Sequence, residues 1–195
     1  MKFKWIFVLA LASQPLIAAE GPSFDCNKLG QKPAAAERLI CEDAELSALD
    51  RQLAKVYSGA REKAHNEQPP MLKAEQRGWI KGRNECWKSS DLKSCVKDNY
   101  LLRIAELQAR YRLLAERGPF FWDCGANGEL VVSFFDSEPR TLIAERGDSV
   151  SLMYSERSAS GAKYQGRNES FWEHKGEATV TWGYGSEPFS CKLKN

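Results

Sequence analysis

Polar side chains gather in the stretch SASGAKYQGRNESFWEHKG, which runs from Ser158 to Gly176. Ser160 carries a hydroxyl and Lys175 carries an ammonium group, and both can donate hydrogen bonds to an acceptor outside the chain. The small residues and the Phe-Trp pair between them form a composition that neither a helix nor a buried strand requires. The stretch is therefore either a solvated hairpin or a docking site, and the surrounding elements must decide which.

Cysteine is the second residue type with distinctive chemistry in this chain. An even number of cysteines in an oxidising compartment predicts disulfides, here three. Zinc is the competing interpretation, but no C-x-x-C pair occurs and His65 is far in sequence from His174. We therefore expect disulfides, with no metal and no other cofactor. The six residues are Cys26, Cys41, Cys86, Cys95, Cys124 and Cys191.

The first nineteen residues have the pattern of a secretory signal. Two lysines precede an apolar run from Ile6 to Ala12, and the segment closes with small residues up to Ala19. A membrane-spanning helix is the alternative, but it needs about 20 apolar residues. A lipoprotein would have a cysteine directly after the cleavage site, whereas the first one is Cys26. We expect residues 1–19 to be a cleaved signal peptide and the mature protein to be periplasmic or secreted, without a stable membrane anchor.

The charge of the chain excludes a strongly basic surface. The whole sequence has 28 basic and 26 acidic residues, and removal of the signal, with Lys2 and Lys4, leaves a formal net charge of zero. Residues 20–117 carry a net +3 and residues 118–195 a net −3. Nucleic acid is therefore not an expected partner, while the mildly acidic second half suits a cationic one.

The first half of the chain has helical periodicity. From Pro33 to Arg117, apolar residues recur in three stripes, which predict three helices in an antiparallel bundle. Asp43 can cap the first long helix, the segment NEQPP at residues 66–70 ends it, and Ser89, Ser90 or Asp91 can cap the last. The stripes include Leu46, Leu49, Leu53, Val56, Tyr57 and Ala60; Leu72, Trp79 and Ile80; and Tyr100, Ile104, Leu107, Tyr111 and Leu114.

The bundle also suggests disulfide partners in the helical half. Cys41, near the start of the first long helix, would meet Cys86, at the end of the returning helix, in an antiparallel hairpin. That pairing leaves Cys26 for Cys95. Connectivity does not follow from sequence alone, so other pairings stay open.

After the segment ERGPFFW the periodicity changes to two residues. Eight short strand candidates, separated by turn sequences, predict a small closed antiparallel barrel in fewer than eighty residues. Cys124 on the first strand and Cys191 on the last would join its two ends, which so small a core needs. The boundary is expected near Gly118 and Pro119, so that the chain is an α+β protein of two domains, a helical bundle and an eight-stranded antiparallel β-barrel.

Residues 120–195 resemble a known family. The segments FWDCGANGELVVSFF, SASGAKY, FWEHKGEATVTW and FSCKL are similar to the MliC and PliC family of inhibitors of c-type lysozyme. The resemblance implies an eight-stranded barrel with paired terminal cysteines, c-type lysozyme as the partner, and no enzymatic activity. It also implies that a serine and a lysine of the matching motifs enter the lysozyme cleft. The lysozyme-binding residues so expected are Ser158, Ser160, Gly161, Ala162, Lys163, Tyr164, His174 and Lys175.

The implied mechanism is chemically reasonable. Lysozymes use two carboxyl groups that flank the scissile glycosidic bond. The Lys175 ammonium would face that negative charge and the Ser160 hydroxyl would donate without bulk. Gly161 and Ala162 keep the loop thin, and Tyr164 either buttresses it or adds a contact at the rim. From pattern alone, however, Ser-Ala-Ser-Gly is an ordinary hairpin connection.

One residue departs from the family pattern. A single residue usually separates the tryptophan from the lysine, but here Glu173 and His174 both lie between Trp172 and Lys175. If the extra residue forms a bulge, Lys175 still reaches the cleft; if it shifts the register, His174 faces the cleft instead. We expect Lys175, because the Lys-Gly pair at the turn is retained.

The first half resembles the LprI N-terminal domain. The motifs are FDC, ICEDAELSALDRQLAKVY, QRGWIKGRNEC and CVKDNYLLRIAEL, with cysteines at 26, 41, 86 and 95. The resemblance covers roughly residues 24–107, and we expect a helical domain at residues 24–117 and a barrel at residues 120–195. The family name implies lysozyme inhibition, but the role of this domain stays open. A homodimer is compatible with the barrel family.

Two other classes of function compete with inhibition. A glycosidase would need a carboxylate pair such as Glu169 with Glu173 or Glu177, but no cleft is expected in so small a barrel. The segment GYGSEP lacks the G-x-S-x-G motif of serine hydrolases. The stronger alternative is a peptidoglycan-binding or envelope scaffold module. Its sugar-stacking residues would be Trp122, Tyr164, Trp172 and Tyr184.

Overall fold

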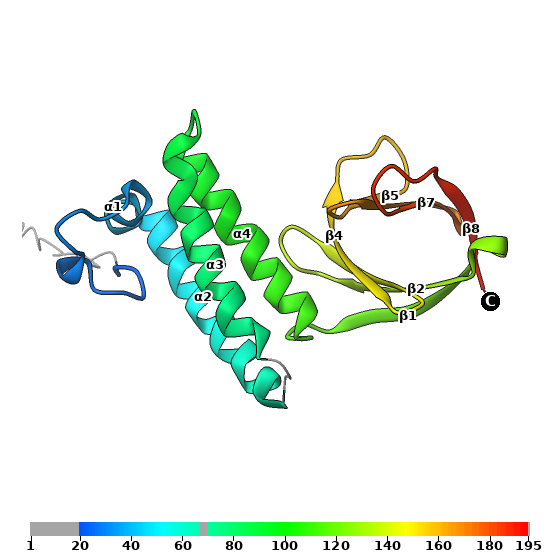
Figure 1. Cartoon of the computed structure of the whole chain (residues 1–195), viewed down its shortest axis with the longest axis horizontal. Coiled ribbons are helices and arrows are strands. Elements are labelled where there is room, and N and C mark those ends of the chain that lie inside the picture. Colours follow the sequence, from blue (N-terminus) through cyan, green and yellow to red (C-terminus); the bar gives the residue numbers. More distant parts are fainter. Residues whose placement is uncertain (1–19, 67–69, 195) are drawn as a thin grey trace, which may run out of the picture.

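The computed structural model describes residues 20–66 and 70–194, and it has a helical half followed by a β-barrel (Figure 1). The expected signal peptide, residues 1–19, lies outside the described residues, as do residues 67–69 of the expected helix break. Within the described ranges, no helix is both long enough and apolar enough to cross a bilayer. The α+β class expected from the sequence is confirmed.

The described part of the helical half has four α-helices, one more than the three that the apolar stripes predicted. The additional helix, α1, is only eight residues long and buries Ala36 and Ile40, which is too little to form a repeating stripe in the sequence. The helices are α1 (Ala35–Glu42), α2 (Ala44–Lys63), α3 (Met71–Asn84) and α4 (Leu92–Arg110), with short 3₁₀ helices at η1 (Cys26–Lys28), η2 (Ala64–Asn66) and η3 (Glu85–Lys88).

Aspartate side chains cap the two longest helices. Asp43 Oδ1 accepts hydrogen bonds from the backbone N–H groups of Glu45 and Leu46, both at 3.0 Å, so the expected cap of α2 is confirmed. At the start of α4, Asp91 Oδ1 accepts from Ser94 N at 2.9 Å. Asp91 is therefore the cap among the three candidates, since such a bond satisfies a backbone donor that the helix itself leaves free.

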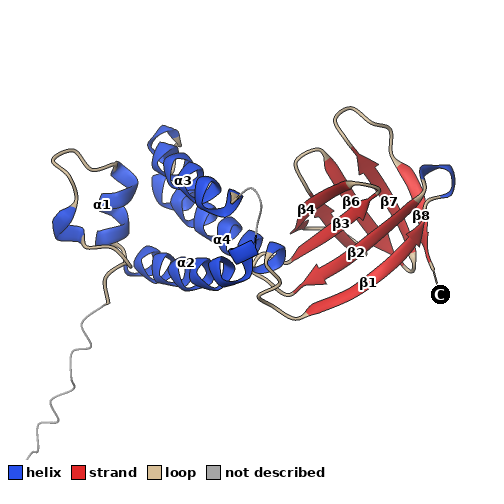
Figure 2. Cartoon of the chain, turned by 60° about the horizontal axis from the view of Figure 1, so that its bottom comes forward, coloured by secondary structure: helices blue, strands red, loops and turns tan. Residues whose placement is uncertain are grey.

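The long helices α2, α3 and α4 run side by side and enclose one apolar core (Figures 1 and 2). The rings of Trp79 and Tyr100 meet edge-on in this core, with centroids 5.2 Å apart. The fully buried members of the core include Ile40, Leu46, Val96, Tyr100 and Leu107.

The disulfides of the helical half differ from the expected pairs. Cys26 is bonded to Cys41 and Cys86 to Cys95, so the expected pairs Cys41 with Cys86 and Cys26 with Cys95 are wrong. The physical reason is α1. Cys41 belongs to this short helix rather than to α2, and α1 brings Cys41 to η1, while Cys86 in η3 lies beside the first turn of α4. Each bond therefore closes a local loop, with sequence separations of 15 and 9.

Eight antiparallel strands form a closed barrel in which each strand pairs with the next and β8 returns to β1 (Figure 2). All eight strands expected from the two-residue period are present. They are β1 (Glu116–Asp123), β2 (Glu129–Phe135), β3 (Thr141–Arg146), β4 (Ser149–Glu156), β5 (Ala162–Gln165), β6 (Glu169–His174), β7 (Glu177–Trp182) and β8 (Phe189–Leu193).

The predicted bond between Cys124 and Cys191 is present, with the two Cα atoms 4.1 Å apart. It follows β1 directly and reaches into β8, where the strand pairing between the two consists of only Trp122 with Leu193 and Asp123 with Lys192. The bond therefore reinforces the least extensive seam of the barrel.

The helical half packs against the outside of the barrel. Ala109 of α4 is buried with Phe135 of β2 and Ile143 of β3, and Leu152 of β4 packs against them. Tyr154 Oη donates to the backbone oxygen of Leu102 at 3.2 Å. The chain passes from α4 to β1 through residues 111–115, so α4 covers the outer face of β2, β3 and β4.

Candidate functional site

Two connections lie next to each other at one end of the barrel. One is the β4–β5 loop, residues 157–161, here called the serine loop; the other is the β6–β7 turn, residues 175–176, here called the lysine turn. In an up-and-down barrel every second connection lies at the same end. Ala162, the first residue after the serine loop, pairs with Glu173, which lies just before the lysine turn, so the loop and the turn are neighbours. The two motifs of the sequence thus share one surface.

Gly161 fixes the distance between the serine loop and β6. Its φ is +68°, and a Cβ atom built on it would lie 2.1 Å from the backbone oxygen of Glu173 and 3.2 Å from the Cβ of His174. Only glycine combines this left-handed backbone with so close an approach. Ser160 is therefore held directly against the end of β6.

Hydrogen bonds further define the serine loop. The Ser158 hydroxyl donates to the backbone oxygen of Ser160 at 2.6 Å, and Trp172 Nε1 donates to the same oxygen at 3.0 Å. The Ser160 hydroxyl itself has no hydrogen bond within the described part of the chain and is exposed. It is free to donate to a partner.

The β6–β7 hairpin is regular up to the lysine turn. His174 pairs with Glu177, no register shift interrupts the ladder, and Lys175 and Gly176 have φ values of 54° and 81°. Positive φ at both central positions is typical of a type I′ turn. The additional residue therefore forms no bulge: His174 takes the last strand position and Lys175 the first turn position.

The side chains of His174 and Ser160 line the same groove on the outer face of β6, β7 and β8. This groove has a volume of about 480 Å³ and also contacts Trp172, which is 45% exposed. Lys175 is exposed at the turn and has no ion pair among the described residues. The structure thus places one basic side chain, His174, in the groove with Ser160 and another, Lys175, at the tip of the neighbouring turn.

The remaining expected site residues lie around the serine loop. Lys163 faces outward and forms an ion pair with Glu156, whose carboxylate is 2.8 Å from the ammonium. Ala162 and Tyr164 face the barrel interior, and burial raises the pKa of the Tyr164 hydroxyl. Tyr164 is 5% exposed and its ring packs beside that of Phe134, with centroids 5.6 Å apart.

The carboxylates and aromatic rings of the competing functions do not gather at one place. Glu173 faces the interior cavity, whereas Glu177 lines the outer groove and Glu169 accepts a hydrogen bond from Ser151 at 3.0 Å. Of the four candidate stacking residues, Trp122 and Tyr164 are buried, while Trp172 and Tyr184 are exposed. The four rings therefore form no common sugar-binding platform.

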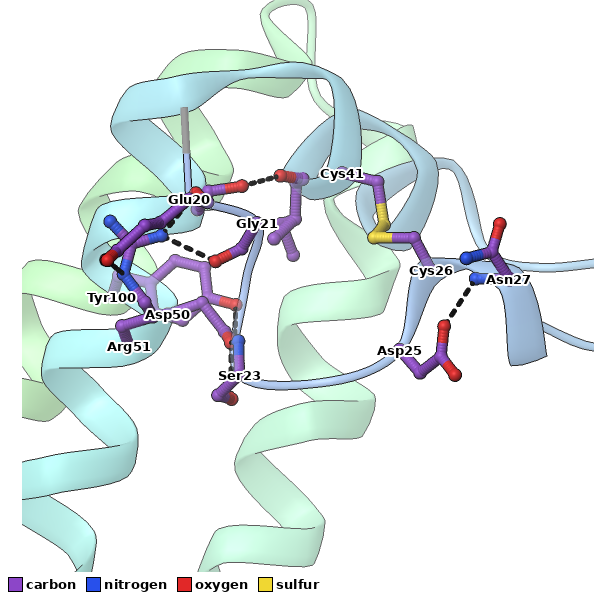
Figure 3. The surroundings of a disulfide bond; sticks show 12 residues. Glu20, Gly21, Ser23, Asp25, Cys26, Asn27, Cys41, Asp50, Arg51 and Tyr100 are labelled. Atoms are coloured by element: carbon purple, nitrogen blue, oxygen red, sulfur yellow. Dashed lines mark hydrogen bonds and ion pairs between the residues drawn. A yellow bond between two sulfur atoms is a disulfide. The ribbon is translucent and has the colours of Figure 1, made fainter. Parts of the chain in front are cut away.

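A buried polar network in the helical half was not predicted from the sequence. Tyr100 Oη donates to Asp50 Oδ1 at 2.7 Å and accepts from Arg83 Nη1 at 2.7 Å, and burial raises the pKa of its hydroxyl. The N–H and hydroxyl of Ser23 both donate to Asp50 Oδ2, beside the bond between Cys26 and Cys41 (Figure 3). Each residue looks like an ordinary surface or stripe position in the sequence, so only long-range packing reveals the network.

The same region holds the first described residues of the chain in place. Arg51 Nη1 donates to the backbone oxygens of Glu20 and Gly21, both at 2.5 Å (Figure 3). With the contacts of Ser23, these bonds attach residues 20–23 to α2. This segment is therefore part of the folded helical half.

Comparison with known proteins identifies both halves. Residues 122–188 match the family model of the membrane-bound lysozyme inhibitor of c-type lysozyme, MliC, and residues 26–117 match the model of the lysozyme inhibitor LprI. The chain is 31% identical over 176 residues to lipoprotein LprI of Mycobacterium bovis and to lipoprotein LprI of Mycobacterium tuberculosis. Each alignment covers 88% of this chain and 84% of the relative.

Proposed function

The chain belongs to the LprI family of lysozyme inhibitors, and we propose that it is an exported protein that inhibits c-type lysozyme by inserting the serine loop and the lysine turn into the active-site cleft of the enzyme. The observation that carries this proposal is the contact between Gly161 and the backbone of Glu173, which brings Ser160 next to the end of β6. A hydroxyl donor and basic side chains thereby share one protruding edge.

The chemistry of this edge is complementary to a lysozyme cleft. The cleft contains two carboxyl groups, one acting as an acid and the other as a nucleophile or stabilising carboxylate. The exposed Lys175 ammonium would face the ionised carboxylate, and the Ser160 hydroxyl would donate a second hydrogen bond. Neither group has an ion pair within the described chain that it would have to give up on binding. The main free-energy cost of the contact is therefore the desolvation of the two groups.

His174 is the second candidate for the basic contact. It lines the same groove as Ser160, whereas Lys175 extends from the turn. The hairpin has no bulge, which is the arrangement that favours His174, but we keep Lys175 as the primary contact, because its ammonium is on a longer side chain at the tip of the hairpin. His174 would then contact the wall of the lysozyme cleft.

The test is an inhibition assay with residues 20–195 and a c-type lysozyme acting on a suspension of bacterial cell walls. We expect inhibition to fall at least about tenfold in Ser160→Ala and in Lys175→Ala, since a hydrogen bond to a charged group contributes roughly 1.5–3 kcal/mol. Arg167→Ala is the matched control, because Arg167 is an exposed cation in the β5–β6 connection at the other end of the barrel.

The outcomes separate the site from the function. If wild-type protein does not slow lysis, inhibition of c-type lysozyme is wrong. If inhibition persists in both variants, only the site is wrong, and a loss in His174→Ala would then assign the contact to His174. Binding of the protein to purified peptidoglycan without any effect on lysozyme would support the scaffold alternative instead.

Export is part of the same proposal. We propose that residues 1–19 are removed and that the mature protein begins at Glu20, in the periplasm or outside the cell. All six cysteines are in disulfides, which is typical of proteins in oxidising compartments. The measurement is the N-terminal sequence of the exported protein, and a start at any residue other than Glu20 would contradict the proposed cleavage site.

A further inference from the structure

The open end of the barrel contains a cavity that is distinct from the outer groove. This barrel-mouth cavity has a volume of about 280 Å³, and its lining includes Phe120 and Trp122 of β1, Phe134 of β2 and Tyr164 of β5. These side chains point inward from the strands, so the cavity continues the apolar core of the barrel toward solvent. Its size is near the lower limit of small-molecule sites, which are roughly 300–1,000 Å³.

Two hydrogen-bond donors in the cavity lining have no partner in the described chain. Trp122 is 3% exposed, and its Nε1 atom is buried without a hydrogen bond. Tyr164 is 5% exposed as a whole, and its hydroxyl makes no hydrogen bond with the described residues and stays accessible to solvent. The Tyr164 hydroxyl can therefore donate to a ligand in the cavity, whereas the Trp122 indole N–H is closed off from solvent in this structure.

The rim of the cavity carries positive charge on one side. Arg117 at the start of β1 and Arg140 before β3 both line the cavity, and each guanidinium is 3.6 Å from the carboxylate of Asp136, which lies between them. The Arg117 guanidinium also lies over the ring of Phe134, 5.7 Å from its centroid. The side chains of Arg117 and Arg140 are 57% and 67% exposed, so both can reach a ligand at the entrance.

The opposite side of the cavity has one carboxylate. Glu173 faces inward from β6, and its Oε1 accepts a hydrogen bond from the backbone N–H of Gly176 at 3.1 Å. Charge is therefore distributed unevenly around the mouth: the guanidinium groups lie at the start of β1 and before β3, and the Glu173 carboxylate lies at β6. An anionic group of a ligand has its favourable position beside Arg117 and Arg140.

We propose that the barrel-mouth cavity binds a small organic anion, an aryl or acyl carboxylate whose apolar body packs among Phe120, Trp122 and Phe134 and whose carboxylate contacts Arg117 and Arg140. Planar guanidinium groups suit a carboxylate because they can bind both of its oxygens. Aromatic side chains supply the apolar contact that such a body needs. The cavity opens at the same end of the barrel as the serine loop, but neither Ser160 nor Lys175 lines it, so anion binding can be tested separately from lysozyme inhibition.

The test uses 3-phenylpropionate and octanoate as probes, with octanamide as the uncharged comparison. Residues 20–195 labelled with ¹⁵N are titrated, and the indole N–H resonances are followed in the ¹H–¹⁵N spectrum. We expect a saturable shift of the Trp122 resonance, which is assigned by its absence in Trp122→Phe, and no shift of Trp79 or Trp87 in the helical half. Octanamide should bind at least about tenfold more weakly than octanoate, because it lacks the charge.

Variants test each part of the site. Arg117→Gln with Arg140→Gln should weaken octanoate binding roughly tenfold or more, and Tyr164→Phe should weaken it less, because a neutral hydrogen bond contributes only about 0.5–1.5 kcal/mol. Arg146→Gln is the matched control, since Arg146 lies at the other end of the barrel, near the β3–β4 turn. Glu173→Gln should leave binding unchanged or tighten it.

Three results would overturn the proposal. The first is the lack of any saturable Trp122 shift at millimolar probe, in wild-type protein and in Glu173→Gln alike. The second is equal affinity for octanoate and octanamide. The third is weaker anion binding in Glu173→Gln, which would indicate a site for a cation or zwitterion. If Trp122→Phe fails to fold, the Tyr164→Phe and arginine variants still decide the outcome, provided that their melting temperatures match that of the wild type.

Discussion

The indole nitrogen of Trp172 donates a hydrogen bond of 3.0 Å to the backbone oxygen of Ser160, across the strand pair of β5 and β6. The same oxygen accepts a hydrogen bond from the Ser158 hydroxyl, so the Ser160 carbonyl group accepts both of the bonds that order the serine loop. Trp172 is thereby both a wall of the outer groove and a support for the loop that we assign to lysozyme binding.

Removal of this donor should loosen the loop without unfolding the barrel. In Trp172→Phe the aromatic ring remains and the hydrogen bond is lost, so inhibition should weaken roughly threefold to tenfold, as expected for a bond of about 0.5–1.5 kcal/mol. The measurement is the inhibition constant in the cell-wall lysis assay, with Trp87→Phe as the control at an exposed tryptophan of the helical half. An unchanged constant would show that the bond does not order the loop in solution.

Gly161→Ala should displace the serine loop. The new Cβ would lie 2.1 Å from the Glu173 oxygen in addition to the strain of φ +68°, so we expect a loss of stability of about 1–3 kcal/mol or more and at least a tenfold loss of inhibition. The matched control is Gly147→Ala, where φ is +55° but no atom lies within 4 Å of the added Cβ. Similar losses in both variants would mean that backbone strain, rather than the contact with β6, accounts for the effect.

The three disulfides should contribute unequally to stability. The bond between Cys124 and Cys191 has a sequence separation of 67, so its removal in a double serine variant should cost roughly 4 kcal/mol. The bonds with separations of 15 and 9 should contribute less, because they close shorter loops. Peptide mapping without reduction checks the connectivity itself: a peptide joining Cys41 to Cys86 would contradict the structure.

Lowering the pH should reveal how much the negative charge of Asp43 contributes to the stability of the fold. Its hydrogen bond with the Lys93 ammonium, which is 2.6 Å away, lowers the pKa of the Asp43 carboxyl below its usual value of 3.8. A lowered pKa in the folded state means that the stabilisation is present above the unfolded pKa and is lost as the pH falls through the folded one. Asp43→Asn retains a capping side chain, so its melting temperature should be lower than that of the wild type at pH 7 and equal to it at pH 2.

Asp98→Asn provides the control for that experiment, since Asp98 is exposed and has no ion pair among the described residues. It should change the melting temperature little at either pH. A difference between Asp43→Asn and wild type that persists at pH 2 would indicate a change in cap geometry instead of a lost charge interaction.

The buried network of the helical half should depend on the Tyr100 hydroxyl. Tyr100→Phe leaves Asp50 Oδ1 and Arg83 Nη1 without their shared partner in a buried site, which should cost about 1–3 kcal/mol of unfolding free energy. Denaturant unfolding measures the loss, with Tyr57→Phe at the partly buried surface of α2 as the comparison. Equal stability of the two variants would show that solvent replaces the lost bonds.

Much of the fold could be predicted because its determinants are local. Alternating apolar residues mark all eight strands, and the caps Asp43 and Asp91 stand directly before their helices. The Cys124–Cys191 pair follows from the order of the strands around a closed barrel. The two helical disulfides could not be predicted, because they depend on whether Cys41 lies on α1 or on α2, and eight residues are too few to show a helical period.

The candidate site was predictable in its members but not in its geometry. The sequence identifies Ser160, His174 and Lys175 as candidates. Whether the additional residue between Trp172 and Lys175 lies in the strand or in the turn depends on the pairing of His174 with Glu177, and the residue pattern of one strand does not specify that pairing. The barrel-mouth cavity could not be predicted for a related reason. Period two places Trp122 and Tyr164 inside the barrel, but only the packing around them determines that both donors lack a partner.

The packing of α4 on β2, β3 and β4 restricts the directions from which a macromolecule can reach the barrel. The helix covers part of the outer face of β2 to β4, so a bulky enzyme cannot approach through that part, whereas the outer groove on β6 to β8 stays uncovered. The helical half is thus a steric shield that makes the barrel one-sided.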